Sequence, residues 1–250
     1  MAQLVDGSLG MGYGVTSNSF LISLGVAPAL ASASVHTAEI FTTLVSGGSH
    51  LFVGNVKKTW LLNLIVPGVT AGAAGAFLLS KVPGNTIKPY IASVLLILGC
   101  IILYRFLRTK KQLNLEKEEK KLNWSGRVRI GALALVAAGV DAIGGGGWGP
   151  IATPGLILST NTEPRKVVGT VNLAEFFITC SISGTFLLLI GWENFNWSLL
   201  LSLTVAGMIA APLAALICRR LPVRAAGMAI GILIILYNLR TLLKIYLNIG

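Results

Sequence analysis

The chain has 250 residues, of which 54% are hydrophobic and only 12% are charged. Soluble domains carry about a quarter charged residues, so this composition excludes an ordinary soluble fold and indicates a protein that faces lipid over most of its surface. The net charge of +11 does not indicate a nucleic-acid partner, because the basic residues cluster between apolar blocks, as topology signals of membrane proteins do.

Eight apolar blocks follow one another along the chain, and each has room for the roughly 20 residues of a membrane element. They cover residues 1–25, 28–53, 59–80, 86–108, 127–159, 164–191, 196–218 and 223–248. A hydrophilic, charged stretch separates the first four blocks from the last four. We therefore expect an all-α polytopic membrane protein with a first transmembrane repeat over 1–108, a basic cytoplasmic linker over 109–124 and a second repeat over 125–250.

The first block of each half contains a glycine run, Gly7–Gly14 and Gly144–Gly149. Glycine costs a helix interior about 1 kcal/mol per residue, so each run predicts a re-entrant or discontinuous helix. The N–H groups and the positive dipole end of a broken helix bind anions, which predicts an anion cradle made by two opposed helix tips. Close packing of helices through small residues is the alternative reading.

The distribution of Lys and Arg indicates how the two halves are oriented. If the glycine-broken elements turn back to the side they entered, 16 of the 20 basic residues lie on one side of the membrane and 4 on the other. If all eight blocks span, the division is 13 against 7. The steeper asymmetry favours the first model, in which each half has an odd number of spans and the halves are inverted repeats.

The second block of each half carries a polar face with a carboxylate, Glu39 or Glu175, at one constant offset in the chain. His36 and Asn172 lie three residues earlier, on the same helix face. Because these two side chains can donate hydrogen bonds, we expect them to meet the oxygens of an anion. An ionised glutamate would repel that anion, so Glu39 and Glu175 are interpreted as proton carriers or as caps of broken backbone.

Further candidates lie at matched positions of the two halves. Asp6 and Asp141 lie just before the glycine runs and are expected to have a structural capping role. Tyr13 and Trp148 lie inside the breaks, where their O–H and N–H groups are candidates to reach a ligand while their rings gate the site. The complete set predicted to bind substrate is Gly12, Tyr13, Ser34, His36, Gly147, Trp148, Thr170 and Asn172.

The sequence offers little support for catalysis. The three cysteines lie in apolar segments without a CxxC pair or metal-ligand spacing, and no nucleophile and base share a recognisable motif. We expect no metal, no cofactor and no enzymatic activity. A membrane protein that hands sulfur compounds to a partner through Cys180 is a remaining alternative.

The residues Asp141-Ala-Ile-Gly-Gly-Gly-Gly-Trp-Gly-Pro150 and Val168-Gly-Thr-Val-Asn-Leu-Ala-Glu175, with Gly54-Asn-Val56 and Trp60 in the first half, resemble the TauE/SafE sulfite-exporter-like family of the TSUP superfamily. This resemblance implies a multi-pass permease of a bacterial or archaeal inner membrane that exports sulfite or an organosulfonate. Proton coupling and a homodimeric assembly are left open. An anion channel and a carrier of other small organic anions are the alternatives.

Overall fold

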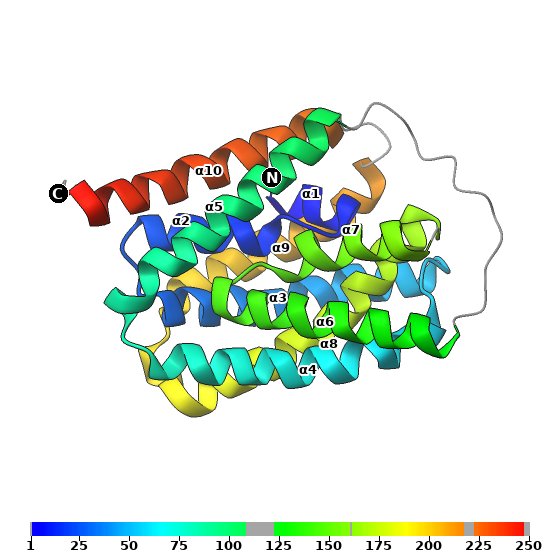
Figure 1. Cartoon of the computed structure of the whole chain (residues 1–250), viewed down its shortest axis with the longest axis horizontal. Helices are drawn as coiled ribbons and strands as arrows, with labels where there is room; N and C mark the ends of the chain where they lie inside the picture. Colours follow the sequence, from blue (N-terminus) through cyan, green and yellow to red (C-terminus); the bar gives the residue numbers. More distant parts are fainter. Residues whose placement is uncertain (1, 109–122, 161, 218–222, 248–250) are drawn as a thin grey trace.

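The computed structural model describes residues 2–108, 123–160, 162–217 and 223–247, which form a bundle of helices (Figure 1). The helices of the first half are α1 (Ala2–Leu9), α2 (Tyr13–Ser23), α3 (Pro28–Phe52), α4 (Lys58–Lys81) and α5 (Gly84–Arg108). Those of the second half are α6 (Trp124–Gly144), α7 (Trp148–Thr160), α8 (Pro164–Ile190), the short 3-10 helix η1 (Trp192–Asn194), α9 (Trp197–Ile217) and α10 (Val223–Leu247). The all-α prediction is confirmed over these residues. The predicted linker, 109–124, falls almost wholly outside them.

Four of the described helices are long and apolar enough to cross a bilayer. They are α4, α5, α8 and the stretch Met228–Leu247 of α10. Their outer faces expose large apolar side chains; on α5 these include Val94, Ile97 and Ile101, which follow the three- and four-residue spacing of one helix face. Such a face suits lipid, which confirms the prediction of a membrane-embedded protein.

Small residues bring the helices at the centre close together. Gly68 and Gly72 of α4 lie against Ile178 and Ile182 of α8, and a Cβ added at Gly72 would lie 2.8 Å from Ile182 Cγ1. Gly47 of α3 meets the backbone of α8 in the same way. Small residues at such crossings let the helix backbones approach closely. In lipid the hydrophobic effect does not drive helices together, so these close van der Waals contacts stabilise the packing. The polar faces of α3 and α8 are thereby turned away from lipid.

Each predicted glycine-broken element consists of two helices joined by a short break. In the first half the break lies between α1 and α2, where Gly10 and Gly12 have φ values of 66° and 126°. In the second half it lies between α6 and α7, where Gly145 has a φ of 66°. Side chains other than glycine rarely adopt these angles, so the glycines explain where the helices end.

The element formed by α6 and α7 is a hairpin rather than a span. Gly155 of α7 packs on Leu133 of α6, and a Cβ added at Gly155 would lie 2.7 Å from Leu133 Cδ2. Figure 1 shows α6 and α7 side by side, with the break at one end of the pair. The chain therefore leaves this element at the same end of the molecule at which it entered.

Corresponding helices of the two halves run in opposite directions. α3 and α8 are antiparallel, because Gly47 meets Leu173 while Gly169 meets His50. α5 and α10 are antiparallel as well, because Gly99 contacts Ile234 while Gly231 contacts Leu103. The inverted repeat remains a prediction, and these directions support it.

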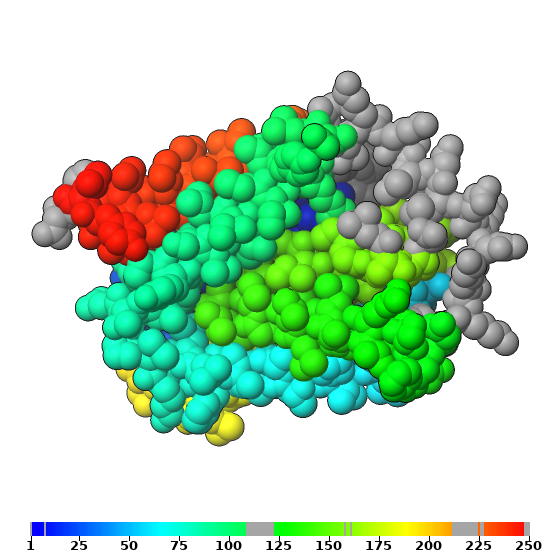
Figure 2. Space-filling view, in the orientation of Figure 1, coloured from blue at the N-terminus to red at the C-terminus, as the bar shows by residue number. Residues whose placement is uncertain are grey.

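α5 and α10 form a pair at one edge of the bundle. Figure 2 shows α5 between α10 on one side and the surfaces of α7, α6 and α4 on the other. The pair also packs on α2, while α3, α4, α6, α8 and α9 pack mainly on one another. The broken elements thus lie at the junction between an edge pair and a larger group of helices.

Candidate functional site

The two glycine breaks cross each other in direct backbone contact. A Cβ added at Gly14, just after the first break, would lie 2.9 Å from the Cα of Gly146 in the second break. Gly149 faces the first break in turn, and its added Cβ would lie 2.8 Å from Met11 Cα. Gly146 itself leaves no room for a side chain, because the backbone of Val15 occupies that place. The halves therefore meet at the breaks.

Two reciprocal hydrogen bonds join the breaks. Asn18 of α2 donates through Nδ2 to the carbonyl of Gly144, the last residue of α6. Thr153 of α7 donates through Oγ1 to the carbonyl of Gly10, 2.9 Å away, just after α1 ends. Each half thus donates a hydrogen bond to a backbone carbonyl that lacks a helical partner at the break of the other half. Sequence reasoning missed both residues, although they share the constant offset of Tyr13 and Trp148.

Asp6 and Asp141 cap the helices that follow the breaks. Asp141 Oδ1 accepts from the backbone N–H groups of Gly147, at 2.7 Å, and Trp148, at 3.1 Å. Asp6 Oδ1 accepts from the N–H of Tyr13 at the longer distance of 3.3 Å. Both carboxyl groups are buried. A carboxylate at this place satisfies free donors and opposes the positive end of the helix dipole.

His36 lies against Asp141 at the centre of the molecule. Its Nε2 is 3.1 Å from Asp141 Oδ2, and its Nδ1 is 2.8 Å from the carbonyl oxygen of Ser32. Because a carbonyl only accepts, Nδ1 must carry a proton. The contact between Nε2 and Oδ2 then needs one more proton, on the imidazole or on the carboxyl group. His36 is fully buried, so this proton is held away from solvent.

Glu39 and Glu175 complete an acidic cluster. Their exposed fractions are 4% and 6%, and Oε2 of each has no hydrogen-bond partner. Glu39 Oε1 lies at the crossing of the breaks, where a Cβ added at Gly14 would be 2.7 Å away. Both glutamates interact electrostatically with Asp6 and Asp141. Four carboxyl groups and one histidine therefore share the region where the halves meet.

Asn172 lies at the close crossing of α3 and α8. Its Nδ2 donates to Ser46 Oγ at 3.1 Å, while its Oδ1 is buried without a partner. Its backbone carbonyl lies beside Gly47, whose added Cβ would be 3.1 Å away. The amide therefore has one unused hydrogen-bonding atom next to the polar faces of both helices.

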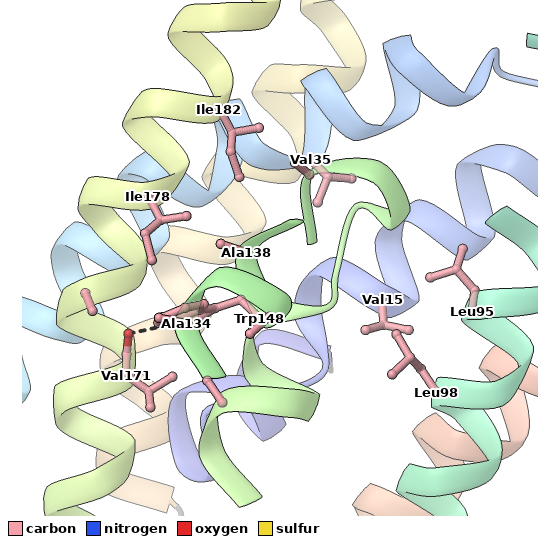
Figure 3. Packing of buried hydrophobic residues seen from close by; sticks show 14 of the residues in the cluster. Val15, Val35, Leu95, Leu98, Ala134, Ala138, Trp148, Val171, Ile178 and Ile182 are labelled. Atoms are coloured by element: carbon pink, nitrogen blue, oxygen red, sulfur yellow. Dashed lines mark hydrogen bonds between the residues drawn. The ribbon is translucent and has the colours of Figure 1, made fainter. Parts of the chain in front are cut away.

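The other predicted substrate-binding residues are buried near the breaks and use their donors within the protein. Tyr13 O–H donates to the carbonyl of Leu203 at 3.0 Å. Trp148 Nε1 donates to the carbonyl of Val171 at 3.2 Å, and Figure 3 shows the indole ring between the second break and α8. In this arrangement the two donors proposed to reach a ligand are held by backbone carbonyls, as expected for polar groups buried in a membrane protein.

Thr170, Ser34 and Gly12 lie at different places around this centre. Thr170 Oγ1 accepts from the backbone N–H of Lys57 at 2.9 Å, so it anchors the loop between α3 and α4. Ser34 is buried on α3, with an exposed fraction of 4%. Gly12 precedes α2 and lies near Ile230 of α10. Within the described ranges, no three His, Cys, Asp or Glu side chains are placed to hold a metal ion.

The comparisons with known proteins agree on one family. The family model described as "Sulfite exporter TauE/SafE" matches residues 1–241. A curated relative, the "Probable membrane transporter protein YtnM" of Bacillus subtilis (strain 168), is 47% identical over 244 residues, which cover 98% of this chain and 80% of the relative. No solved structure matches the chain. The chain belongs to the TauE/SafE sulfite exporter family of membrane transporters.

Proposed function

We propose that this chain is a secondary transporter of the bacterial or archaeal inner membrane that exports small sulfur-containing anions, sulfite or an organosulfonate. The observation that carries the proposal is the meeting of two helix N-termini, those of α2 and α7, at the crossing of the breaks. The N–H groups of a helix N-terminus and its positive dipole end favour oxyanions. The family name points to the same class of substrate.

The substrate site in this proposal lies between the halves. Backbone N–H groups around Gly12 and Gly147 would hold the oxyanion, and His36 and Asn172 would donate to its remaining oxygens. The unused Oδ1 of Asn172 accepts the amine or hydroxyl group of an organosulfonate. Glu39 and Glu175 are too close to the site to be ionised beside a bound anion, so we assign them to proton coupling rather than to direct binding.

Alternating access follows from the inverted arrangement that we propose for the halves. Corresponding helices run in opposite directions, and the breaks exchange hydrogen bonds reciprocally. In transporters built this way, one group of helices rocks against another around a central site. The pair α5–α10, together with α2, is the natural moving group, because its contacts with the remaining helices are fewer than those inside either group.

Sulfite and organosulfonate flux in membrane vesicles tests the proposal. His36→Ala and Asn172→Ala should each lower the flux about ten- to a hundredfold, because a hydrogen bond to a charged group contributes about 1.5–3 kcal/mol. Asn194→Ala, at an exposed position of η1, is the matched control and should leave the flux unchanged.

Three results of that experiment argue against parts of the proposal. Unchanged flux in both site variants rules out the placement of the site. Flux that saturates with neither sulfite nor sulfonate and ignores the proton gradient indicates a channel. Loss of flux after thiols are blocked, reproduced by Cys180→Ala alone, indicates sulfur handling through Cys180.

A further inference from the structure

Three hydrogen-bond donors at the second break point at one carboxylate. Asp141 Oδ1 accepts the N–H groups of Gly147 and Trp148, and Asp141 Oδ2 faces His36 Nε2. These are the donors that the proposed function gives to the substrate. A carboxylate and an incoming oxyanion cannot both accept them, because each N–H group here already has one acceptor at hydrogen-bond distance.

We propose that Asp141 is an internal anion that occupies the substrate's oxyanion site at the start of α7. A proton taken up by the Asp141–His36 pair releases the carboxylate, and the sulfite or sulfonate oxygens take its place. This inference rests on the proposed function and adds to it the identity of the group that substrate must displace.

The proton balance follows from the contacts of His36. His36 Nδ1 carries one proton, which it donates to the carbonyl of Ser32. Before an anion binds, one further proton is shared between His36 Nε2 and Asp141 Oδ2. A second proton then has room only on the carboxyl group, which leaves a neutral Asp141 beside a charged imidazolium. The neutral acid accepts hydrogen bonds more weakly, and the imidazolium favours an anion at the freed N–H groups. The site therefore takes up one proton for each anion that it binds.

Three further carboxyl groups lie near Asp141. Glu39 of the same helix as His36, Asp6 of α1 and Glu175 of α8 act on it electrostatically. α7 carries no titratable side chain, and α4 carries Lys58 and Lys81 only at its ends. Tyr13 of α2 lies close to Asp6, and α5 meets Gly144 through Leu95. Among the described residues, His36 is the basic side chain that contacts Asp141.

A second observation points to the same place. Glu39 Oε2 is buried without a hydrogen-bond partner, three residues along α3 from His36, and Glu39 Oε1 reaches the crossing of the breaks. A buried carboxyl atom with no partner has the capacity to receive the proton that the pair exchanges. Asp6, in contrast, accepts a single N–H group at 3.3 Å. The exchange is therefore assigned to the second break alone.

Anion binding to the purified full-length protein at several pH values tests the proposal. The probes are methanesulfonate, whose own charge stays constant over this range, and sulfite. In the wild type the dissociation constant for methanesulfonate should rise about tenfold for each unit of pH, as expected when one proton is linked to one anion. Asp141→Asn keeps an acceptor for the two N–H groups and a donor for His36 but cannot take up a proton, so its dissociation constant for methanesulfonate should depend much less on pH than that of the wild type.

Glu193→Gln, which removes an exposed carboxylate of η1, is the control and should keep the pH slope. An Asp141→Asn protein with the wild-type slope overturns this proposal and leaves the proposed function standing. A wild type that binds neither methanesulfonate nor sulfite at any pH overturns the proposed function, and the inference falls with it.

Calorimetry of the wild type in two buffers of different ionisation enthalpy gives an answer even if the variant does not fold. The expected result is uptake of about one proton per methanesulfonate bound. Binding without proton uptake contradicts the proposal. Transport by this route is electroneutral for a monoanion, so flux of methanesulfonate into proteoliposomes should not respond to membrane potential.

Discussion

Gly146 is the position at which the two halves leave the least space for a side chain. Its missing Cβ allows the backbone of Val15 to pass directly against it. A side chain here would force apart two segments whose conformations are already fixed by left-handed glycines on both sides.

We therefore expect Gly146→Ala to lower the yield of folded protein and its melting temperature in detergent. Overpacking a dense core costs about 1–3 kcal/mol, and a clash with backbone cannot be relieved by rotating a side chain. Gly139→Ala is the control, because a Cβ at that α6 position meets nothing within 4 Å. Equal stability of the two variants would contradict the backbone crossing.

Thr153 gives a second test of the crossing. Thr153→Val keeps the shape of the side chain but removes the donor to the Gly10 carbonyl, which then has no partner at the break. We expect a loss of about 1–2 kcal/mol of unfolding free energy in detergent. Thr160→Val is the control. It removes a hydrogen bond to the Leu156 carbonyl, which already accepts a backbone hydrogen bond within α7, so the loss of unfolding free energy should be smaller. A larger effect at Thr160 would count against the reciprocal bonds.

The site residues show where sequence reasoning succeeds and where it stops. The capping positions of Asp6 and Asp141 follow from the chain alone, since an acid shortly before a glycine run can accept from the helix that comes next. The contact of His36 with Asp141 does not, because it joins residues that are 105 positions apart and depends on how the halves cross. Asn18 was missed for the same reason.

Among the helices, length and apolar content were sufficient to predict the continuous spans. The block expected over 164–191 is α8, Pro164–Ile190, and the block over 86–108 is α5, Gly84–Arg108. Periodicity could not reveal that the block over 127–159 folds into a hairpin, because both of its helices are apolar. The count of basic residues favoured a hairpin. Only an element that returns to the side it entered places Arg165 and Lys166 on the side of the membrane that carries most of the basic residues.

The α6–α7 hairpin predicts which cysteines are reached from each side of the membrane. In a background without Cys100, Cys180 and Cys218, single cysteines replacing Ser125 at the start of α6 and Ser159 at the end of α7 should react with an impermeant maleimide from the same side. A cysteine replacing Asn194 in η1 should react from the opposite side and is the control. Labelling of the Ser125 and Ser159 positions from opposite sides would mean that α6 and α7 together cross the membrane.

For the molecule as a whole, the opposed directions of α5 and α10 predict the orientation of the chain. The side carrying the linker should face the cytoplasm, because most basic residues lie there. A fluorescent protein fused after Arg108 should fluoresce, whereas alkaline phosphatase fused after Gly250 should be active outside the cytoplasm. The same phosphatase fused after Arg108 is the inactive control. Both reporters on one side of the membrane would indicate parallel halves.

The reciprocal bonds between the breaks also constrain how the protein is made. The hydrogen bond to the carbonyl of Gly10 cannot form until the ribosome has added its donor, Thr153, 143 residues later. Until then this carbonyl lacks its hydrogen-bond donor, and the bilayer core has no water to replace that donor. Insertion of the early helices and completion of the hydrogen bonds at the centre are thus separate events in time.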